Sequence, residues 1–138
     1  MSVEVSTDAS RLEVERIHRW LSEDAYWSLG RTLDVVARSI EHSLNFGAYD
    51  DHGEQVGYAR VVTDHATFAW LCDVYVEPSS RGGGVGTALL EAVSAHLVGL
   101  RLSRTLLATA DAHSLYTRYG FAPLPHPSRF MIRAAPER

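Results

Sequence analysis

A run of glycines, Arg81-Gly82-Gly83-Gly84-Val85-Gly86, separates an apolar segment from an amphipathic one and constrains the fold more than any other stretch. Because glycine lacks a Cβ atom, the backbone here can adopt positive φ angles and its N–H groups can approach a ligand closely. The next segment has helical periodicity, and a helix start presents unpaired N–H groups that favour a bound anion. We interpret residues 81–86 as an anion-binding turn to which Arg81 adds a full charge. A flexible turn without a ligand is the alternative.

Spacing excludes two common phosphate-binding motifs. The P-loop pattern G-x-x-x-x-G-K-[ST] requires a lysine, and the chain contains no lysine. The dinucleotide-binding pattern G-x-G-x-x-G would require its third glycine at Thr87 or at Leu89, depending on where it starts. Neither motif therefore explains the loop.

Two other patterns do fit the sequence. Arg81, Gly84 and Gly86 match [QR]-x-x-G-x-[GA], and residues 112–121 match A-x-x-L-Y-x-x-x-G-F. Both patterns resemble those of the GNAT superfamily of N-acetyltransferases, in which the first binds acetyl-CoA. The resemblance implies acetyl-CoA as cofactor, with its pyrophosphate on the loop and its pantetheine arm paired with the strand before it. The cofactor-binding residues would then be Val74, Val76, Arg81, Gly82, Gly83, Gly84, Val85, Gly86 and Thr87.

Periodicity predicts one α/β domain over residues 1–138 with the order β-α-α-β-β-β-α-β-α-β-β, and the resemblance implies that its sheet is mixed. Ser10 and Glu13 form a capping-box pattern for the first helix, and Thr32 can cap the second. The expected strands are residues 3–6, 45–49, 55–62, 68–76, 105–109, 121–124 and 129–133. The third helix follows the glycine loop, and Asp111 is expected to cap the fourth. This order resembles the GNAT fold, which implies that the fourth and fifth strands splay apart around the cofactor.

Composition narrows the function classes. The 138 residues are 46% hydrophobic, enough for a single core. No apolar run approaches the length of a membrane span and no leader pattern opens the chain, so we expect a cytoplasmic protein without membrane association. A net charge of −4 argues against nucleic-acid binding and is compatible with a cationic amine. The single cysteine, Cys72, is expected to be a small buried residue.

Tyr116 is the candidate general acid. The resemblance maps it onto the family tyrosine that reaches the cofactor sulfur, and a phenol with a pKa of about 10 can protonate a thiolate of similar basicity. The alternative is a core aromatic residue, because Tyr116 lies on the apolar stripe of its predicted helix.

Asp73 is the second candidate catalytic residue, as the only carboxylate within residues 68–76. A charge in an apolar strand is costly unless it is paired or used. Several GNAT enzymes have an acidic base on this strand, acting directly or through water, and strand alternation puts Asp73 on one face with Leu71 and Tyr75. A structural ion pair or strand-end hydrogen bond is the alternative.

Three further residues are candidates for acceptor binding. His113 precedes Tyr116 by three positions on one helix face, and histidine as a residue type can take a proton from an amine; a surface or capping histidine is the alternative. Tyr26 and Trp27 lie in the segment between the first two helices, which overhangs the acceptor site in the family; simple packing is the alternative. The remaining histidines show no metal-ligand spacing, so we expect no metal.

The sequence thus predicts an acetyl-CoA-dependent N-acetyltransferase that moves an acetyl group to a primary amine by direct attack in a ternary complex. A non-catalytic acyl-CoA-binding or sensing module is the second hypothesis, and an interaction module without a ligand is the third. The acceptor would be a small-molecule or peptide amine. The sequence identifies neither the acceptor nor the oligomeric state, and a homodimer is compatible with it.

Overall fold

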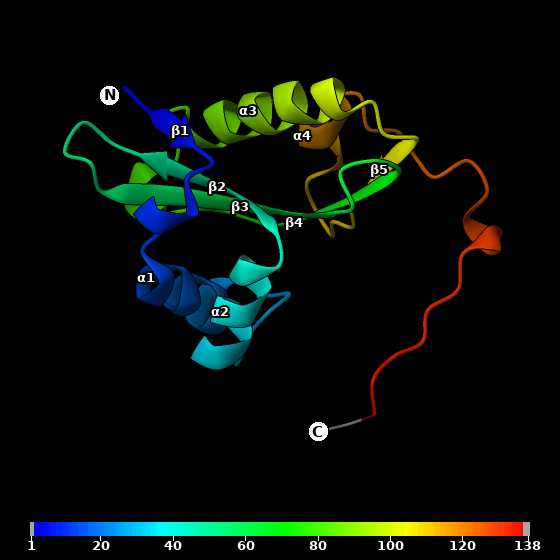
Figure 1. Cartoon of the computed structure of the whole chain (residues 1–138), viewed down its shortest axis with the longest axis horizontal. Helices are drawn as coiled ribbons and strands as arrows, with labels where there is room; N and C mark the ends of the chain where they lie inside the picture. The colour runs from blue at the N-terminus through cyan, green and yellow to red at the C-terminus, as the bar shows by residue number, and fades with distance from the viewer. Residues whose placement is uncertain (1, 137–138) are drawn as a thin grey trace. The chain divides into compact units, whose positions relative to one another are not determined.

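The computed structural model describes residues 2–136, which divide into two compact units between Ala108 and Thr109. The first unit contains the sheet and most of the helical residues (Figure 1). The second contains one short helix and irregular chain. The two units are described separately below.

A five-stranded mixed sheet forms the centre of the first unit. Its strands are β1 (Glu4–Ser6), β2 (Leu44–Tyr49), β3 (Gln55–Thr63), β4 (Phe68–Val76) and β5 (Arg104–Leu106), in the order β1-β2-β3-β4-β5. Neighbours from β1 to β4 are antiparallel, whereas β4 and β5 are parallel. The mixed sheet and the strand order confirm the predicted fold class, although the expected strand at 105–109 is shorter than predicted.

Strand β4 pairs with β5 along only part of its length. The register joins Phe68 to Arg104 and Trp70 to Leu106, and no pairing continues beyond these residues. Strand β4 continues to Val76 while β5 ends at Leu106, so within the described part of the chain the second half of β4 has no strand neighbour on that side. This unpaired edge lies where the resemblance implies that the fourth and fifth strands splay apart.

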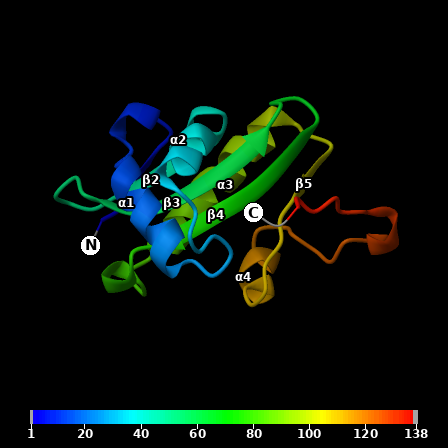
Figure 2. The same cartoon turned by 90° about the horizontal axis from the view of Figure 1, so that it is seen from below.

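Helices cover both faces of the sheet (Figures 1 and 2). Helices α1 (Val14–Arg19) and α2 (Leu33–Glu41) lie on one face, and α3 (Val85–Leu100) lies on the other. The α1 and α2 side has a core of buried side chains from both helices, their connection and the sheet: Ile17, Trp20, Leu21, Ala25, Val36, Ile40, Tyr58 and Tyr75.

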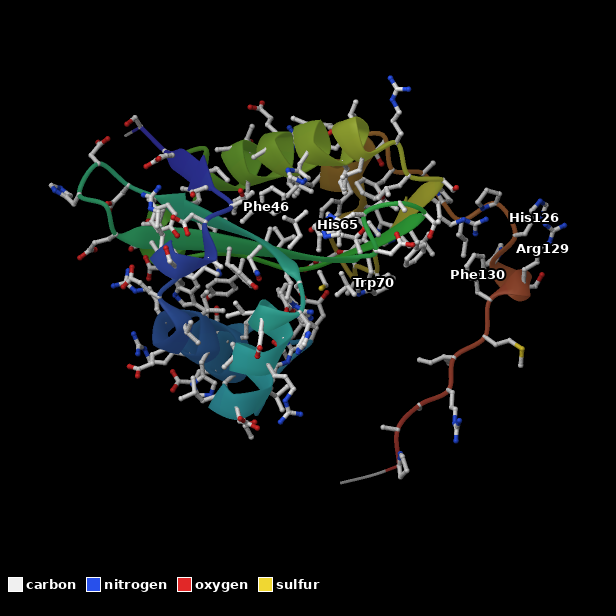
Figure 3. The ribbon with its side chains drawn as sticks, in the orientation of Figure 1. Phe46, His65, Trp70, His126, Arg129 and Phe130 are labelled. Carbon is white, nitrogen blue, oxygen red and sulfur yellow. The ribbon has the colours of Figure 1, made fainter. Side chains whose placement is uncertain are left out.

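Helix α3 approaches the sheet closely at Gly57 of β3. A Cβ atom there would lie 2.9 Å from both Val85 Cγ1 and Leu89 Cδ1. Farther along the helix, the ring of His96 meets the ring of Phe46 edge-on, and Figure 3 shows Phe46 pointing to the α3 side of the sheet. Glycine at position 57 therefore fixes the depth at which the start of α3 sits on the sheet.

A β-bulge interrupts β4 at Asp73. Tyr58 lies opposite Tyr75, but Arg60, two residues later, lies opposite Cys72, so β4 contains one extra residue. Asp73 has φ 52°, in the left-handed region that aspartate tolerates better than most residues. The expected alternation is wrong here, because the extra residue brings Cys72 and Tyr75 to the same face.

The N-terminal helix begins differently from the prediction. Asp8, not Ser10, caps a short 3₁₀ turn at Ala9–Arg11, and α1 starts after Glu13 without a side-chain cap. A carboxylate oxygen of Glu13 instead accepts the backbone N–H of Gln55 on β3. The Thr32 cap of α2 is confirmed, since its hydroxyl accepts the N–H of Val35 at 3.3 Å.

The second unit contains α4 (His113–Thr117), which ends near Gly120 at φ 90°. Asp111 does not cap this helix; the N-cap is Ala112, whose N–H donates to the Thr109 hydroxyl. The predicted strands at 121–124 and 129–133 are not found, and residues 127–129 form a 3₁₀ turn. Prolines at 123, 125 and 127 supply no N–H for a ladder, and the apolar residues at 131 and 132 are 98% and 90% exposed with no strand beside them.

Candidate active site

The glycine loop adopts the conformation that its sequence permits. Gly82 and Gly84 have φ 85° and 87°, and a Cβ atom at either position would meet no other atom within 4 Å. The backbone is therefore exposed on the side where side chains would otherwise project. This is the surface that close approach of a phosphate group requires.

Helix α3 starts directly from this loop. Gly84 is its N-cap and no side chain caps it, so the helix supplies no acceptor for the N–H groups of Val85, Gly86 and Thr87. The helix is 16 residues long, and its dipole adds partial positive charge at this end. Val85 is 1% exposed because its side chain packs into the core, so only its backbone can serve a ligand. Loop and helix together form a row of donors suited to an anion.

The Arg81 side chain lies along the end of β4. Its Nε donates to the carbonyl of Val76 at 3.0 Å, and its guanidinium lies over the Tyr75 ring at 5.3 Å. Nη2 is 3.5 Å from Asp24, with both side chains more than half exposed. An exposed ion pair of this kind contributes less than about 1 kcal/mol, so the contact with Asp24 holds the Arg81 side chain only weakly.

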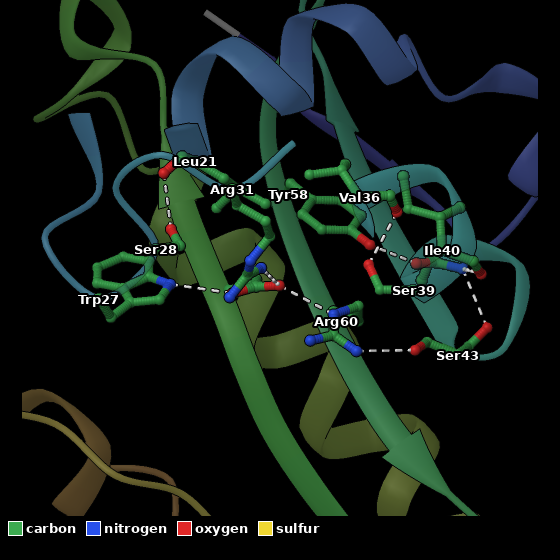
Figure 4. A network of polar contacts seen from close by, with 12 residues as sticks. Leu21, Trp27, Ser28, Arg31, Val36, Ser39, Ile40, Ser43, Tyr58 and Arg60 are labelled. Atoms are coloured by element: carbon green, nitrogen blue, oxygen red, sulfur yellow. Dashed lines mark hydrogen bonds and ion pairs between the residues drawn. The ribbon is translucent and has the colours of Figure 1, made fainter. Parts of the chain in front are cut away.

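Asp73 is the centre of a polar network that includes Trp27, Arg31 and Arg60. Figure 4 shows these three side chains with their polar contacts as dashed lines. Oδ1 accepts the indole N–H of Trp27 at 2.9 Å, and Oδ2 accepts one N–H each from Arg31 and Arg60, also at 2.9 Å. The Asp73 side chain is 2% exposed, against 23% for Arg31 and 15% for Arg60. Both carboxylate oxygens are thus engaged, and they tie the segment between α1 and α2 to the bulge of β4.

Two other titratable side chains of β4, Cys72 and Tyr75, stand before and after Asp73 in the strand. Burial raises the pKa of the Cys72 thiol to about 11, against the attraction of nearby Arg60, so the thiol stays protonated at neutral pH. Burial and the hydrogen bond to Asp24 raise the pKa of Tyr75 to about 12, so its hydroxyl remains a donor to that carboxylate. Neither group is poised as a nucleophile.

The predicted acceptor-site aromatics lie on the surface of the first unit. Tyr26 and Trp27 are 55% and 42% exposed, and their rings meet edge-on with centroids 5.0 Å apart. The bond from Trp27 to Asp73 restrains the indole, so a fixed aromatic surface stands beside the bulge. Ser28 further anchors this segment by donating its hydroxyl to the carbonyl of Leu21.

Tyr116 and His113 belong to α4 in the second unit. The Tyr116 ring is partly buried and meets the ring of Phe121 edge-on at 5.9 Å. His113 is exposed, and its carbonyl accepts the hydroxyl of Thr117. Their predicted roles depend on where α4 lies relative to the sheet, so both remain predictions.

The sequence analysis overlooked Arg31 and Arg60, the two cationic partners of Asp73. One signal was available: Arg60 is the only charged residue in β3, just as Asp73 is in β4. Neighbouring antiparallel strands that each carry one buried charge are expected to pair those charges. Arg31 offered no such signal, since it stands in a connecting segment.

Within residues 2–136, no group of three or more histidine, cysteine or acidic side chains is arranged to hold a metal ion. Over the same residues, no helix is both long enough and apolar enough to cross a membrane.

Comparison with known proteins shows the family. Residues 41–123 match the family described as "Acetyltransferase (GNAT) domain". A Gibberella zeae protein described as an acetyltransferase is 34% identical over 131 residues, spanning 81% of this chain and 74% of that protein. The chain belongs to the GNAT acetyltransferase family.

Solved structures agree with the fold. A protein of Xanthomonas campestris pv. campestris, described as an acetyltransferase of the GNAT family, shares 50% identity and a TM-score of 0.93, over 99% of this chain and 95% of that one. A Mycobacterium tuberculosis protein solved in complex with CoA has a TM-score of 0.70 at 22% identity, covering 88% of this chain and 72% of that one. At this identity the Mycobacterium tuberculosis protein shows a similar fold and no more.

Proposed function

We propose that this protein is an acetyl-CoA-dependent N-acetyltransferase that moves an acetyl group to a primary amine by direct attack in a ternary complex. The observation that carries the proposal is the glycine loop, with Gly82 and Gly84 in the left-handed region before the uncapped start of α3. Membership of the GNAT family supports acetyl transfer in general terms.

Acetyl-CoA would supply an activated acetyl group as a thioester and leave as a thiol. The N–H groups of residues 82–87 would bind its pyrophosphate, with Arg81 released from the end of β4 to add charge. The open edge of β4 near Val74 and Val76 offers main-chain groups that an extended arm can pair with, as an added strand would.

We assign the general acid to Tyr116, on the strength of its match to the family motif in residues 112–121. Its hydroxyl would give a proton to the sulfur as the thiolate departs, while the acceptor nitrogen attacks the carbonyl carbon. The amine must lose a proton to attack, and a water molecule or His113 is proposed to take it.

Asp73 is proposed to act on the acceptor side of the reaction. Three donors already engage its two oxygens, which favours holding Trp27 and Arg31 in place over accepting a proton directly. The same engagement is the observation that favours the second candidate function, an acyl-CoA-binding or sensing module without acceptor chemistry.

Thiol release separates the two candidates. Purified protein is mixed with acetyl-CoA and a panel of amines, and free CoA is measured with a thiol reagent, with amine-free reactions as the control. An acetyltransferase releases CoA in proportion to acetylated amine identified by mass spectrometry. A binding module binds acetyl-CoA but releases no CoA above the control with any amine, and that result would overturn the enzymatic proposal. The cytoplasmic location, the homodimer and the absence of nucleic-acid and membrane partners stay predictions.

A further inference from the structure

The network at Asp73 carries an excess of positive charge. Two guanidinium groups, from Arg31 and Arg60, meet one carboxylate within hydrogen-bonding distance. Among residues 2–136, Asp73 is the one carboxylate that pairs with either guanidinium, so two positive charges share a single carboxylate.

Arg31 is the arginine with unused donors toward solvent. Its Nη1 is committed to Asp73, whereas Nε and Nη2 have no acceptor among residues 2–136. Arg60 is more committed and more buried, since it also donates to the Ser43 hydroxyl. A guanidinium held by one N–H and 23% exposed can still receive a carboxylate on its other N–H groups.

An aromatic surface adjoins this donor. Trp27 shares the carboxylate of Asp73 with Arg31, so the indole and the guanidinium are fixed within one hydrogen-bonded cluster. Trp27 is 42% exposed, and the Tyr26 ring, 55% exposed, lies against it at a right angle and extends the aromatic surface. A ligand bound to Arg31 would thus have a place for an apolar or aromatic group beside its anionic group.

The position of the cluster limits the size of such a ligand. Asp73 is next to Val74, where the arm of acetyl-CoA is proposed to pair with β4, and Arg31 lies 2.9 Å from Asp73. A carboxylate on Arg31 would hold an attached amine a few bonds from the strand that carries the thioester. A long spacer between carboxylate and amine would place the amine too far away.

We propose that the acceptor is a small α-amino acid with an aromatic or apolar side chain, whose carboxylate binds Arg31 and whose side chain lies on Trp27. The proposal rests on the proposed acetyltransferase function and names the substrate class for the same site. It makes Arg31 a specificity-determining residue that binds substrate.

Pairs of acceptors that differ only in the carboxylate test this substrate class. L-phenylalanine is compared with phenethylamine, and L-tryptophan with tryptamine, by CoA release at saturating acetyl-CoA, with rates expressed per unprotonated amine. The amino acids should be favoured by about 10- to 100-fold in kcat/KM, the range of a charge-assisted bidentate pair. Equal use of both members, or preference for the amines, would overturn the proposal. So would acetyl-CoA binding with no turnover of either amino acid.

Arg31→Gln should remove this preference. The preference for each amino acid over its matched amine, expressed as the ratio of their kcat/KM values, should fall by about 10- to 100-fold. Arg38→Gln is the matched control, because Arg38 lies on helix α2, is 68% exposed and, within residues 2–136, pairs only with Asp34. An equal fall for acids and amines would show that Arg31 is structural and would overturn its assigned role.

Calorimetry with acetyl-CoA distinguishes failure of the proposed acetyltransferase function from failure of the proposed substrate class. If wild-type protein neither binds acetyl-CoA nor releases CoA, the proposed function fails as a whole. If it acetylates amines without regard to the carboxylate, the function stands and this inference fails. If Arg31→Gln does not fold, Arg31→Lys is used instead, because it keeps the charge but loses the planar guanidinium; its preference for amino acids over amines should be reduced. The comparison of acceptor pairs with wild-type protein requires no variant.

Discussion

Replacing Asp73 should reveal two separate energetic features of β4: the ion pairs, which stabilise the fold, and the left-handed backbone, which is strained for most residues. The side chain is 2% exposed and binds two guanidinium groups that are 23% and 15% exposed. Removing one partner of a buried ion pair costs about 3–5 kcal/mol, and the partial exposure of both arginines places this case near about 3 kcal/mol. Asp73→Ala should lose this amount and, at φ 52°, about 1 kcal/mol more from backbone strain.

Asp73→Asn and Asp73→Gly separate the two features. Asparagine tolerates the left-handed region and keeps an oxygen for the Trp27 indole, so its loss in free energy of unfolding should be smaller than that of alanine by about 1–2 kcal/mol. Glycine removes the side chain but relieves the backbone, so Asp73→Gly should be more stable than Asp73→Ala. At an ordinary strand position the alanine variant is the more stable of the two, by about 0.5–1 kcal/mol.

Urea unfolding followed by tryptophan fluorescence measures all three variants. An alanine variant as stable as the glycine variant would refute the left-handed bulge, and losses below about 1 kcal/mol throughout would refute the buried ion pairs. Acetyl-CoA affinity should change little in any folded variant, because the network does not include the glycine loop.

Three further predictions concern single positions. Tyr116→Phe should lower turnover by about 10²-fold or more and change acetyl-CoA affinity by no more than a few-fold. The loss of turnover should be smaller for acyl donors whose leaving groups are less basic. Turnover equal to that of the wild-type protein would refute Tyr116 as the general acid. Gly57→Ala should lower the free energy of unfolding by about 1–3 kcal/mol, because its Cβ would lie 2.9 Å from two buried side chains; unchanged urea stability would contradict this packing. Because the pKa of Cys72 is raised to about 11, its thiolate is present below that pH only as a minor species, and alkylation by iodoacetamide should rise about tenfold per pH unit until pH 11. Alkylation at pH 8 as fast as that of free cysteine would show the thiol to be exposed.

Much of the fold was predictable because local signals were strong. The apolar segment 68–76 is β4 to the residue, Thr32 caps α2, and Gly82 and Gly84 of the loop have the positive φ angles that glycine permits. At each of these positions the local preference and the tertiary environment agree.

The errors fall where a neighbour outweighs the local signal. Nothing in the sequence marks the bulge at Asp73, since a one-residue insertion in a strand is visible only from its partner. Ser10 and Asp111 have capping side chains, but nearby Asp8 and Thr109 make the hydrogen bonds instead. The predicted strands after residue 120 lack a pairing neighbour, which a strand requires whatever its propensity. The arginines around Asp73 come together only through the fold.

Titration calorimetry with acetyl-CoA tests the central claim, that the loop before α3 binds the cofactor, most directly. Gly84→Val is compared with Gly53→Val, because both glycines have positive φ, 87° and 77°, and both would place a Cβ in open space. The two variants should lose similar stability, so a difference in binding reports the loop alone. We predict one site per wild-type chain, wild-type affinity in Gly53→Val, and at least tenfold weaker binding in Gly84→Val. Equal affinity in the two folded variants, or no binding by the wild-type protein, would contradict the account.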